Sequence, residues 1–361
     1  MTNKIRVPVL SPSGEPLMPT TSARARKWIV SGKAKPVWND LNIFCVQLLV
    51  EPSGTVVQDI AVGIDPGKLF SGVAAVSRKA VLFTAHLVLP FRRVIARKQT
   101  QKILRRARRG RRINRNIPFT QRAHRQKRFD NRRGNKLPPS IRANRQLELR
   151  VVKELNKLFP ITSITYEYVK ARGNKGFSPV MVGQKWMLKQ LSSIASTHTL
   201  EGWKTSVLRQ QLGLEKNQKD KSSQELATHA NDGIALAASQ FMEYKTFRGK
   251  TAYWVGSVEL TESPFKVVSR PQLYRRQLHF ENHSKGGTRK RKGGTVTPFG
   301  FRSGDLAQAE KAGRTYRGYI GGYTNAKTKA LSLYDVNWKR LGQFSPNKTK
   351  LLRRNNGLCI A

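Results

Sequence analysis

Early in the chain, three short apolar runs are separated by turn residues. The runs are Ile60–Asp65, Ser71–Val76 and Ala80–Leu89, and Pro66-Gly67 follows the first of them. Apolar runs of this length, bounded by glycine, proline and polar residues, predict β-strands. We therefore expect an antiparallel meander that has Asp65 at the end of its first strand.

Further along, the apolar positions change to helical spacing. After Pro138-Pro139, leucines and valines recur three or four residues apart and predict a helix from about Ser140 to Leu158. A fourth strand is predicted at Ile161–Tyr168, and a helical stretch follows around Trp186. The pattern then predicts a helix from about Gln224 to Glu243.

Residues 1–55 form a small opening unit in this interpretation. Thr20-Thr21-Ser22 supplies N-cap residues for a basic amphipathic helix that should end at Gly32. Two short strands are expected near Pro36–Trp38 and Asn42–Val50. By its residue types alone, the tetrapeptide Pro16-Leu-Met-Pro19 favours an ordinary turn.

The last third of the chain shows weaker alternation of helix and strand patterns. Lys285–Gly294 is rich in glycine, lysine and arginine and is interpreted as a basic flexible linker or loop. Beyond it, Gly318–Tyr323, Ala330–Val336 and Lys348–Arg353 are predicted as short strands. The sequence therefore predicts a small C-terminal β-rich unit.

The charge of the chain indicates a large polyanionic partner. It has 361 residues with 68 Lys and Arg against 21 Asp and Glu, a net charge of +47. Duplex DNA carries one charge per about 1.7 Å of axis, so this excess matches roughly 80 Å of duplex. A small anionic metabolite does not account for it, whereas a large RNA or an RNA–DNA assembly does.

Cysteine usage and hydropathy indicate the cellular compartment in which the protein is expected. Only Cys45 and Cys359 are present, without a Cys-x-x-Cys pair, which excludes a cysteine zinc ribbon and a disulfide framework. No stretch approaches 18 consecutive apolar residues, and the start of the chain lacks a signal-peptide core. We therefore expect a soluble, intracellular protein with no membrane partner.

The most basic segment begins at Arg92. Between Arg92 and Arg133, 18 of 42 residues are Lys or Arg and Asp130 is the only acid. A helix is predicted from 92 to about 113, but its apolar positions are too few for a packed core face. Because no acidic residues compensate the charge, phosphate groups are the expected counter-charge.

Four residues from distant segments form the candidate catalytic set: Asp65, Glu167, His229 and Asp232. A meander, a fourth strand after a helix, and a late helix are the elements of an α/β fold of the RNase H type. In that arrangement, acids at the end of the first strand, on the fourth strand and on the last helix converge at one sheet edge. Carboxylate oxygens suit Mg²⁺, and two such ions would assist phosphodiester hydrolysis.

Within this set we assign Asp65 as the bridging ligand, with Glu167 and Asp232 each holding one ion; Mn²⁺ is expected to substitute. His229 lies one helical turn before Asp232 and either binds an ion or orients the attacking water. Each residue also has a structural interpretation. Asp65 is a common turn residue, His229 by itself suits a structural histidine, and Asp232 suits a helix surface. Glu167 is harder to explain, because an unpaired buried carboxylate is unfavourable.

These motifs resemble the three RuvC segments of the transposon-associated IscB and IsrB families, the ancestor group of Cas9. Gly63-Ile-Asp65-Pro-Gly67 is similar to the first segment, Ile164-Thr-Tyr-Glu167 to the second and His229-Ala-Asn-Asp232 to the third. Pro16-Leu-Met-Pro19 matches the N-terminal PLMP signature, and the arginine-rich stretch resembles the bridge helix. Two C-terminal runs are similar to the end that reads the target-adjacent motif; they are Pro298–Asp305 and Asn337–Phe344.

One departure favours IsrB over IscB. IscB carries an HNH nuclease between its second and third RuvC segments, whereas about 60 residues separate Glu167 from His229 here, with His198 the only histidine between them. His279-Phe-Glu-Asn-His283 lies outside that interval and is interpreted as a loop or RNA contact. The chain therefore resembles IsrB, the relative that lacks HNH.

The resemblance implies an RNA-guided nickase that cuts the displaced, non-target DNA strand. It also implies a guide (omega) RNA, a double-stranded DNA target with an RNA–DNA heteroduplex, and one protein copy per ribonucleoprotein in a prokaryotic cytoplasm. The implied division is a PLMP domain (1–55), RuvC segment I (56–91), a bridge helix (92–135), RuvC segments II and III (136–255) and a C-terminal RNA- and target-adjacent-motif-interacting domain (256–361).

The nucleic-acid contacts expected from this resemblance fall into two sets. The residues expected at the guide or heteroduplex are Arg97, Arg105, Arg106, Arg108, Arg109, Arg111, Arg112 and Arg115. The residues expected at the target-adjacent motif are Arg302, Tyr316, Lys339 and Arg340.

Two alternatives remain open at this point. One is a structural RNA-binding protein, of ribosomal type, with vestigial carboxylates in an RNase H-like fold. The other is a junction resolvase of RuvC type that acts without a guide. The first would show no metal-dependent cutting, and the second would cut branched DNA without RNA and would hardly need the basic stretch.

Overall fold

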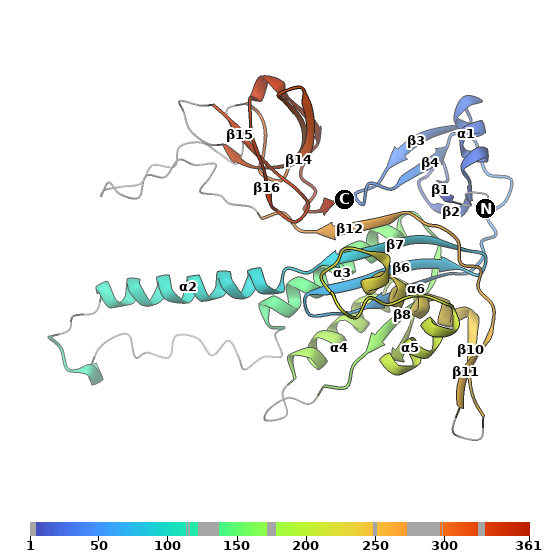
Figure 1. Ribbon diagram of the computed structural model, residues 1–361, viewed down its shortest axis with the longest axis horizontal. Helices are drawn as coiled ribbons and strands as arrows, with labels where there is room; N and C mark the ends of the chain where they lie inside the picture. Colours follow the sequence, from blue (N-terminus) through green and yellow to red (C-terminus); the bar gives the residue numbers. More distant parts are fainter. Residues whose placement is uncertain are drawn as a thin grey trace.

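The computed structural model describes residues 5–112, 114, 116–121, 137–171, 178–247, 251–272, 297, 299–323 and 329–361. Its centre is a seven-stranded sheet with the order β18-β12-β7-β6-β5-β8-β9 (Figure 1). The strands are β5 (Ile60–Asp65), β6 (Phe70–Ser77), β7 (Ala80–Val88), β8 (Ile161–Tyr168), β9 (Ser196–Glu201), β12 (Phe265–Ser269) and β18 (Cys359–Ile360).

The predicted meander is confirmed. β5 pairs antiparallel with β6, and β6 pairs antiparallel with β7, whereas β8 lies parallel to β5 and β9 parallel to β8. In chain order these five strands are arranged 3-2-1-4-5, the order expected of a fold of the RNase H type. The protein is therefore a mixed α/β protein, as the sequence indicates.

Helices cover the two faces of this sheet. α3 (Pro139–Asn156) and α4 (Pro179–Leu191) bury their apolar side chains against one face, in a core that includes Ile64, Leu147 and Met187. α6 (Asn231–Ala238) packs on the other face together with Ala61 and Ala74. The predicted helical spacing is borne out in α3, where Leu147, Val151 and Leu155 are fully buried.

The second face has small residues because α6 lies directly on the strands. A Cβ at Gly63 would be 2.0 Å from the carbonyl oxygen of Gly233, on α6. There is no room for a side chain at Gly63, and a Cβ at Gly233 would make a tight contact, 3.1 Å from the backbone N of Ala74. The glycines of β5 and α6 therefore set how closely the helix approaches the sheet.

The predicted helix at 224–243 is only partly correct. A π-helical turn spans Leu226–Ala230, α6 follows, and a short 3-10 turn at Ser239–Phe241 ends the helical segment. Met242 then begins β10 (Met242–Phe247), which forms a hairpin with β11 (Thr251–Gly256). α5 (Gly202–Gln211) packs between this hairpin and α6. The sequence pattern anticipated neither the hairpin nor β9 and α5.

The N-terminal unit is a four-stranded sheet with one helix. Its strands are β1 (Arg6–Leu10), β2 (Pro16–Thr21), β3 (Ala34–Trp38) and β4 (Phe44–Leu48), in the order β2-β1-β4-β3, and α1 spans Ser22–Val30. Thr21 caps α1 as predicted, because its side chain accepts a hydrogen bond from the backbone N–H of Arg24.

The interpretation of Pro16-Leu-Met-Pro19 as a turn was wrong. The tetrapeptide lies in β2, which pairs with β1 at the edge of the sheet. An edge strand tolerates proline, because a missing N–H on its outer side breaks no ladder hydrogen bond. Met18 packs against the main core, so the segment joins the N-terminal unit to the centre of the protein.

The C-terminal unit is a five-stranded sheet with the order β16-β15-β14-β13-β17. Its strands are β13 (Leu306–Lys311), β14 (Arg314–Tyr323), β15 (Leu331–Tyr334), β16 (Arg340–Phe344) and β17 (Thr349–Arg353). The chain returns from it to the central sheet, where β18 pairs with β12, and β12 is parallel to β7. This return was not anticipated, because β12 and β18 are short and lie inside the segment assigned to the C-terminal unit.

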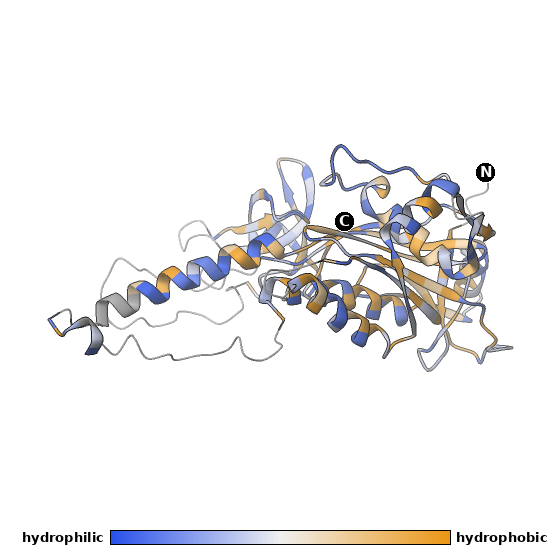
Figure 2. Ribbon diagram, turned by 90° about the horizontal axis from the view of Figure 1, so that it is seen from below, coloured by the Kyte–Doolittle hydropathy of each residue, from blue (hydrophilic) through white to orange (hydrophobic). Residues whose placement is uncertain are grey.

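The predicted basic helix is α2 (Phe91–Arg112), which projects away from the central sheet (Figure 1). Hydrophilic residues recur along it (Figure 2), and its apolar side chains Ile103 and Leu104 are exposed. α2 contacts α3 near its base. That a bound polyanion balances the charge of this helix stays a prediction.

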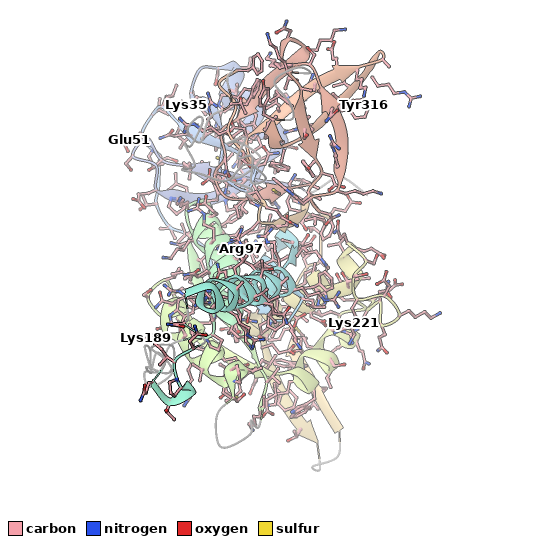
Figure 3. All side chains as sticks on the ribbon, turned by 90° about the vertical axis from the view of Figure 1, so that its left-hand side faces the viewer. Lys35, Glu51, Arg97, Lys189, Lys221 and Tyr316 are labelled. Atoms are coloured by element: carbon pink, nitrogen blue, oxygen red, sulfur yellow. The ribbon has the colours of Figure 1, made fainter. Side chains whose placement is uncertain are left out.

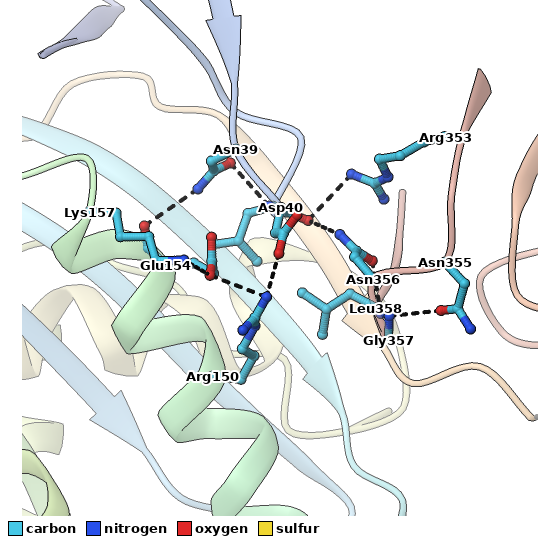
Figure 4. A network of polar contacts seen from close by, with 11 residues as sticks. Asn39, Asp40, Arg150, Glu154, Lys157, Arg353, Asn355, Asn356, Gly357 and Leu358 are labelled. Carbon is cyan, nitrogen blue, oxygen red and sulfur yellow. Dashed lines mark hydrogen bonds and ion pairs between the residues drawn. The ribbon is translucent and has the colours of Figure 1, made fainter. Parts of the chain in front are cut away.

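Asp40 connects all three units (Figure 4). Its carboxylate pairs with Arg150 on α3, and its backbone carbonyl accepts hydrogen bonds from Asn356 at 3.0 Å and Arg353 at 3.4 Å. Arg150 also pairs with Glu154 at 3.3 Å. The N-terminal unit, the central domain and the C-terminal segment therefore meet at one polar junction.

No helix in the described part of the chain is both long and apolar enough to cross a membrane.

Candidate active site

Strand alternation places the predicted acids on the face that α6 covers. On β5, Asp65 lies two residues after Gly63 and four after Ala61. On β8, Glu167 lies two residues after Thr165, and Thr165 pairs with Gly63. Successive side chains of a strand point to opposite faces. Asp65 and Glu167 therefore both point away from the α3 face and toward α6.

Gly72 brings His229 to Asp65. It is the residue on β6 that pairs directly with Asp65, and a Cβ there would be 1.9 Å from the carbonyl oxygen of His229. The π-helical turn thus rests on the strand at the position that a side chain would otherwise fill. In this position His229 Nδ1 lies 3.0 Å from Asp65 Oδ2. A π-turn inside a helix is frequently found at functional sites, and this one sets the direction of His229.

Hydrogen bonding assigns the proton of this histidine. Because the carboxylate of Asp65 accepts, Nδ1 of His229 donates, and Nε2 is the unprotonated nitrogen of the neutral ring. Nε2 of His229 is buried and has no hydrogen-bond partner among the described residues. A bare imidazole nitrogen beside a carboxylate is able to accept a proton or bind a cation.

A second histidine, His86, supports the same turn. It pairs with Gly72 across β6 and β7, is fully buried, and lies 5.4 Å from His229 between ring centroids. Its Nδ1 is 3.0 Å from Thr228 Oγ1, and that hydroxyl donates its proton to the carbonyl of Glu225. Nδ1 of His86 is therefore the donor. Burial, with a smaller contribution from His229, lowers the pKa of His86 to about 4, so the ring is neutral.

Asp232 is placed with the set but is already paired. It is 4% exposed; Oδ1 lies 2.9 Å from Arg209 Nε, and Oδ2 pairs with Lys216 Nζ. Burial and then the charge of Asp65 raise the pKa of Asp232, against the lowering effect of Lys216 and Arg209. The interpretation of Asp232 as a helix-surface residue is therefore wrong.

Glu167 lies near the N-terminus of α5. A Cβ at Gly202 would be 2.9 Å from Glu167 Oε1, so glycine at the first position of α5 leaves room for this carboxylate. Burial first, and then the charges of Asp65 and Asp232, raise the pKa of Glu167 to about 7; a hydrogen bond with Thr205 and the charge of Lys216 oppose the shift. Burial, together with the charges of the two neighbouring acids, therefore favours a proton on Glu167 or a cation beside it.

The donor set suits a hard divalent cation. Asp65, Glu167 and Asp232 offer carboxylate oxygens, the ligands that Mg²⁺ prefers, and their mutual repulsion is what a bound cation would offset. As placed in the structure, no group of three or more His, Cys, Asp or Glu among the described residues is close enough to hold a metal ion. The ammonium of Lys216 provides the positive charge instead. A cation that used both oxygens of Asp232 would have to displace it.

A buried ion pair supports the Asp65-Pro-Gly67 turn from the opposite face of the sheet. Arg145 Nη1 lies 2.8 Å from Glu148 Oε2, and its Nη2 donates to the carbonyl of Gly67 at 2.9 Å. Ser71 donates to Glu148 and accepts from the N–H of Gly67 at 3.1 Å. Glu148 is fully buried, and burial raises its pKa to about 6 despite Arg145 and Ser71. This network fixes the turn that directly follows Asp65.

Sequence reasoning missed several of these residues, although some carried a signal. Arg145 and Glu148 are three apart on the apolar face of α3, so opposite charges at core positions were visible in the helical pattern. Arg209 and Lys216 carried no such signal, because they lie in segments whose structure was not predicted. His86 did carry a signal, because it is a polar residue inside the third apolar run, as Glu167 is inside the fourth.

The residues predicted to bind nucleic acid lie on α2 and in the C-terminal unit, outside the candidate catalytic set. Arg97, Arg105 and Arg106 are exposed on α2, and Figure 3 looks along this helix with Arg97 labelled. The backbone of α2 includes the four arginines at 108, 109, 111 and 112, but their side chains, and all of Arg115, lie outside the described residues. The same holds for Lys285–Gly294, His279–His283 and Pro298.

Arg302, Tyr316, Lys339 and Arg340 all belong to the C-terminal unit. Arg302, Lys339 and Arg340 are exposed. The Tyr316 ring (labelled in Figure 3) packs against Phe344, with 5.1 Å between ring centroids. Tyr316 and Arg340 lie on strands β14 and β16 of the C-terminal sheet, whereas Arg302 and Lys339 lie in the segments that precede β13 and β16. Their role stays a prediction.

A comparison of the sequence with models of protein families gives one match. Residues 7–180 match the model of the RRXRR protein family. The matched segment includes Pro16-Leu-Met-Pro19, Asp65, Glu167 and α2. The pattern that the name spells occurs twice on α2, as Arg105-Arg106-Ala-Arg108-Arg109 and Arg108-Arg109-Gly-Arg111-Arg112. No curated protein matches the chain.

Solved structures of RuvC also match. RuvC of Thermus thermophilus in complex with a Holliday junction substrate is 13% identical over 55% of this chain and 100% of that chain, with a TM-score of 0.29. A second structure of Thermus thermophilus RuvC is 11% identical over 54% of this chain and 99% of that chain, with a TM-score of 0.27. The fold assignment rests on the strand order described above.

The pKa of Glu167 predicts how stability depends on pH without divalent ions. The folded protein holds a proton on Glu167 up to about pH 7, whereas the unfolded chain loses it near pH 4.5. The free energy of unfolding should therefore fall as pH rises between these values. Urea unfolding in the presence of a chelator should show this dependence of the free energy of unfolding on pH. Glu167→Gln should flatten the dependence above about pH 6, because the titration of Glu148 affects stability only below that pH.

The exposed Glu15 offers a matched control, because Glu15→Gln removes a carboxyl far from the site and should retain the slope. An unchanged slope in Glu167→Gln would show that Glu167 ionises normally in the folded protein.

Proposed function

We propose that the protein is a metal-dependent endonuclease that cleaves DNA phosphodiester bonds, and more specifically an RNA-guided nickase that cuts the displaced strand. The observation that carries this proposal is that Asp65, Glu167 and Asp232 lie near enough for their charges to interact, with His229 bonded to Asp65, in a chain of net charge +47. Buried acids in a strongly basic chain suit a site where a cation and a phosphate meet.

The chain's own residues divide the work. Asp65 and Glu167 would hold the Mg²⁺ ions, with Asp232 joining them when Lys216 is displaced; when bound, these ions polarise the phosphate and activate water. Asp65 holds the imidazole of His229 in the tautomer that leaves Nε2 unprotonated. Nε2 is buried, so it would accept a proton from the attacking water only after the ring turns toward the site. Glu167 must lose its proton before it binds a cation, so its raised pKa makes metal affinity depend on pH.

The finer parts of the proposal follow the resemblance to IsrB. We infer that residues 1–55, 56–91, 92–135, 136–255 and 256–361 act as the PLMP, RuvC I, bridge-helix, RuvC II–III and C-terminal parts described above. In this proposal α2 contacts the phosphates of a guide RNA or its heteroduplex, and the exposed arginines of α2 support it. Arg302, Tyr316, Lys339 and Arg340 would contact DNA next to the target.

Plasmid nicking tests the proposal. The protein is purified with its bound RNA, the RNA is sequenced, and a supercoiled plasmid carrying the complementary target is incubated with the complex and Mg²⁺. We expect nicked circles, with the break in the strand that does not pair with the guide, and no cutting in a chelator. Equal nicking after removal of the RNA would favour a guide-independent resolvase, and bound RNA without any cutting would favour a structural RNA-binding protein.

A further inference from the structure

Two adjoining pockets lie at the same end of the central sheet as Asp65. The first, of about 220 Å³, is lined by Phe70 at the start of β6, Leu89 just after β7, Arg270 just after β12, and Trp338 of the C-terminal unit. β7 and β12 are parallel to each other and run in the direction of β5. The ends of these strands therefore form one rim, with Asp65 and Glu167 on one part of it and the pocket on the next.

The second pocket, of about 630 Å³, continues the first. Arg93, Arg270 and Gln272 line both, and Arg93 donates a hydrogen bond to the carbonyl of Arg270 at 2.9 Å. The second pocket extends between the base of α2 and α3, where Arg97 and Lys153 lie in its wall. The two pockets together form one groove, which starts beside the acids and leads to the base of α2.

The groove carries a strong positive charge. The described residues that line it include six cationic side chains and no Asp or Glu; the cations are Arg92, Arg93, Arg97, Arg150, Lys153 and Arg270. Arg150 is also paired with Asp40 and Glu154 behind the wall. Burial first, and then the charge of Arg150, lower the pKa of Arg270. Positive groups crowded in this way are stabilised by an anion that spans them, such as a chain of phosphates.

The end of the groove nearest the acids has aromatic walls. The Phe70 ring lies 5.9 Å from that of His229 and 5.2 Å from that of His86, between centroids, so it separates the pocket from the catalytic set. Trp338 is 9% exposed, stacks on Tyr334 at 5.1 Å, and its indole N–H has no hydrogen-bond partner among the described residues. Trp338 also has a left-handed backbone, with φ of 65°, which a bulky residue rarely adopts without a functional or packing reason.

A flat aromatic wall next to arginines suits a nucleobase followed by its phosphates. We propose that this groove holds the single DNA strand that is cut. One base of the strand lies in the first pocket against Phe70 and Trp338, and the adjoining phosphates lie on the arginines of the second pocket. Arg97, at the base of α2, is thereby assigned to DNA in place of the guide contact that the resemblance implies, and the outer arginines of α2 stay with the guide. The inference rests on the proposed function, because it names the substrate segment next to the same acids. The ring of Phe70 contacts that of His229, so a strand held in the first pocket passes next to the catalytic set.

Binding in Ca²⁺ without cutting tests the groove. The full chain, with its co-purified RNA, is titrated with a fluorescent oligo-dT, and the dissociation constant is measured at several salt concentrations. Phe70→Leu keeps the apolar packing but removes the stacking face, and should weaken binding about 5- to 100-fold. Arg97→Gln should weaken binding and reduce the salt slope by about 0.7. Arg26→Gln, an exposed arginine of the N-terminal unit, is the matched control and should change neither.

Photocrosslinking locates the base independently of folding effects. Oligonucleotides carrying 5-iodo-deoxyuridine are irradiated with the unmodified protein, and the crosslinked peptides are identified by mass spectrometry. We expect crosslinks to Phe70 or Trp338. Crosslinks only elsewhere, or Phe70→Leu and Arg97→Gln binding oligo-dT as tightly as Arg26→Gln, would overturn the inference. Preferential crosslinking of the same residues to an RNA probe would also overturn it, since it would assign the groove to RNA.

These outcomes separate the groove from the nuclease activity. Crosslinks in the groove without any plasmid nicking would reject the proposed function and leave a single-strand-binding site. Nicking with crosslinks elsewhere would reject the groove alone.

Discussion

Replacing Asp65 with Asn is expected to lower the rate of nicking by at least about 10³-fold, equivalent to about 4 kcal/mol of transition-state stabilisation. The amide keeps the size of the side chain but loses the charge that would bind Mg²⁺, and it no longer accepts the proton of His229 Nδ1 as a carboxylate does. Plasmid nicking measured under single-turnover conditions checks this expectation.

Binding should survive the same substitution. The net charge changes only from +47 to +48, and Asp65 lies on the sheet rim, away from the exposed arginines of α2. RNA content and target affinity in Ca²⁺ should therefore equal those of the natural protein. Asp59→Asn, an exposed acid just before β5, is the matched control and should cut normally. Loss of RNA binding together with cutting in Asp65→Asn would instead identify Asp65 as a structural residue.

Replacing Arg145 with Met is expected to lower the free energy of unfolding by about 3–5 kcal/mol, because it leaves Glu148 buried without its partner. Glu148 is fully buried, and Arg145 is its ion-pair partner at 2.8 Å. Urea unfolding at neutral pH measures the loss. The loss should shrink as the pH falls, since a protonated Glu148 carries no charge to be compensated.

The double variant Arg145→Met/Glu148→Leu separates charge from packing. With both charges removed, much of the lost stability should return, because a buried ion pair replaced by apolar residues is often close to neutral. Arg142→Met, an exposed arginine on the same helix, is the matched control and should change stability little. A double variant as unstable as Arg145→Met would show that the loss comes from packing at Arg145 and not from the buried charge.

The site shows how a strongly basic chain can keep a small acidic cluster. Arg209 and Lys216 neutralise Asp232, and Arg145 neutralises Glu148 behind the turn. Burial first, and then the charges of Asp65 and Asp232, raise the pKa of Glu167. A bound cation would offset the repulsion between these carboxylates.

The predictions that held depend on local pattern. β5, β6, β7 and β8 and the helices α2 and α3 lie within one or two residues of the ranges inferred from the sequence. Two predictions failed where neighbours decided the outcome. Pro16-Leu-Met-Pro19 became a strand because β1 offered it an edge, and the segment 224–243 was divided because Met242 pairs with Gly256 in a hairpin.

The sequence by itself determined the meander, the position of Asp65 at a strand end, the helical period of α3 and the need for a polyanion, because each is written in nearest-neighbour spacing or in total charge. Strand alternation together with the observed pairing of Gly63 and Thr165 puts Asp65 and Glu167 on one face. Only the tertiary structure decided that Gly72 admits the backbone of His229, that Arg209 and Lys216 hold Asp232, and that β12 and β18 return to complete the basic groove. These features depend on contacts between segments that lie up to hundreds of residues apart, and no local pattern encodes such distances.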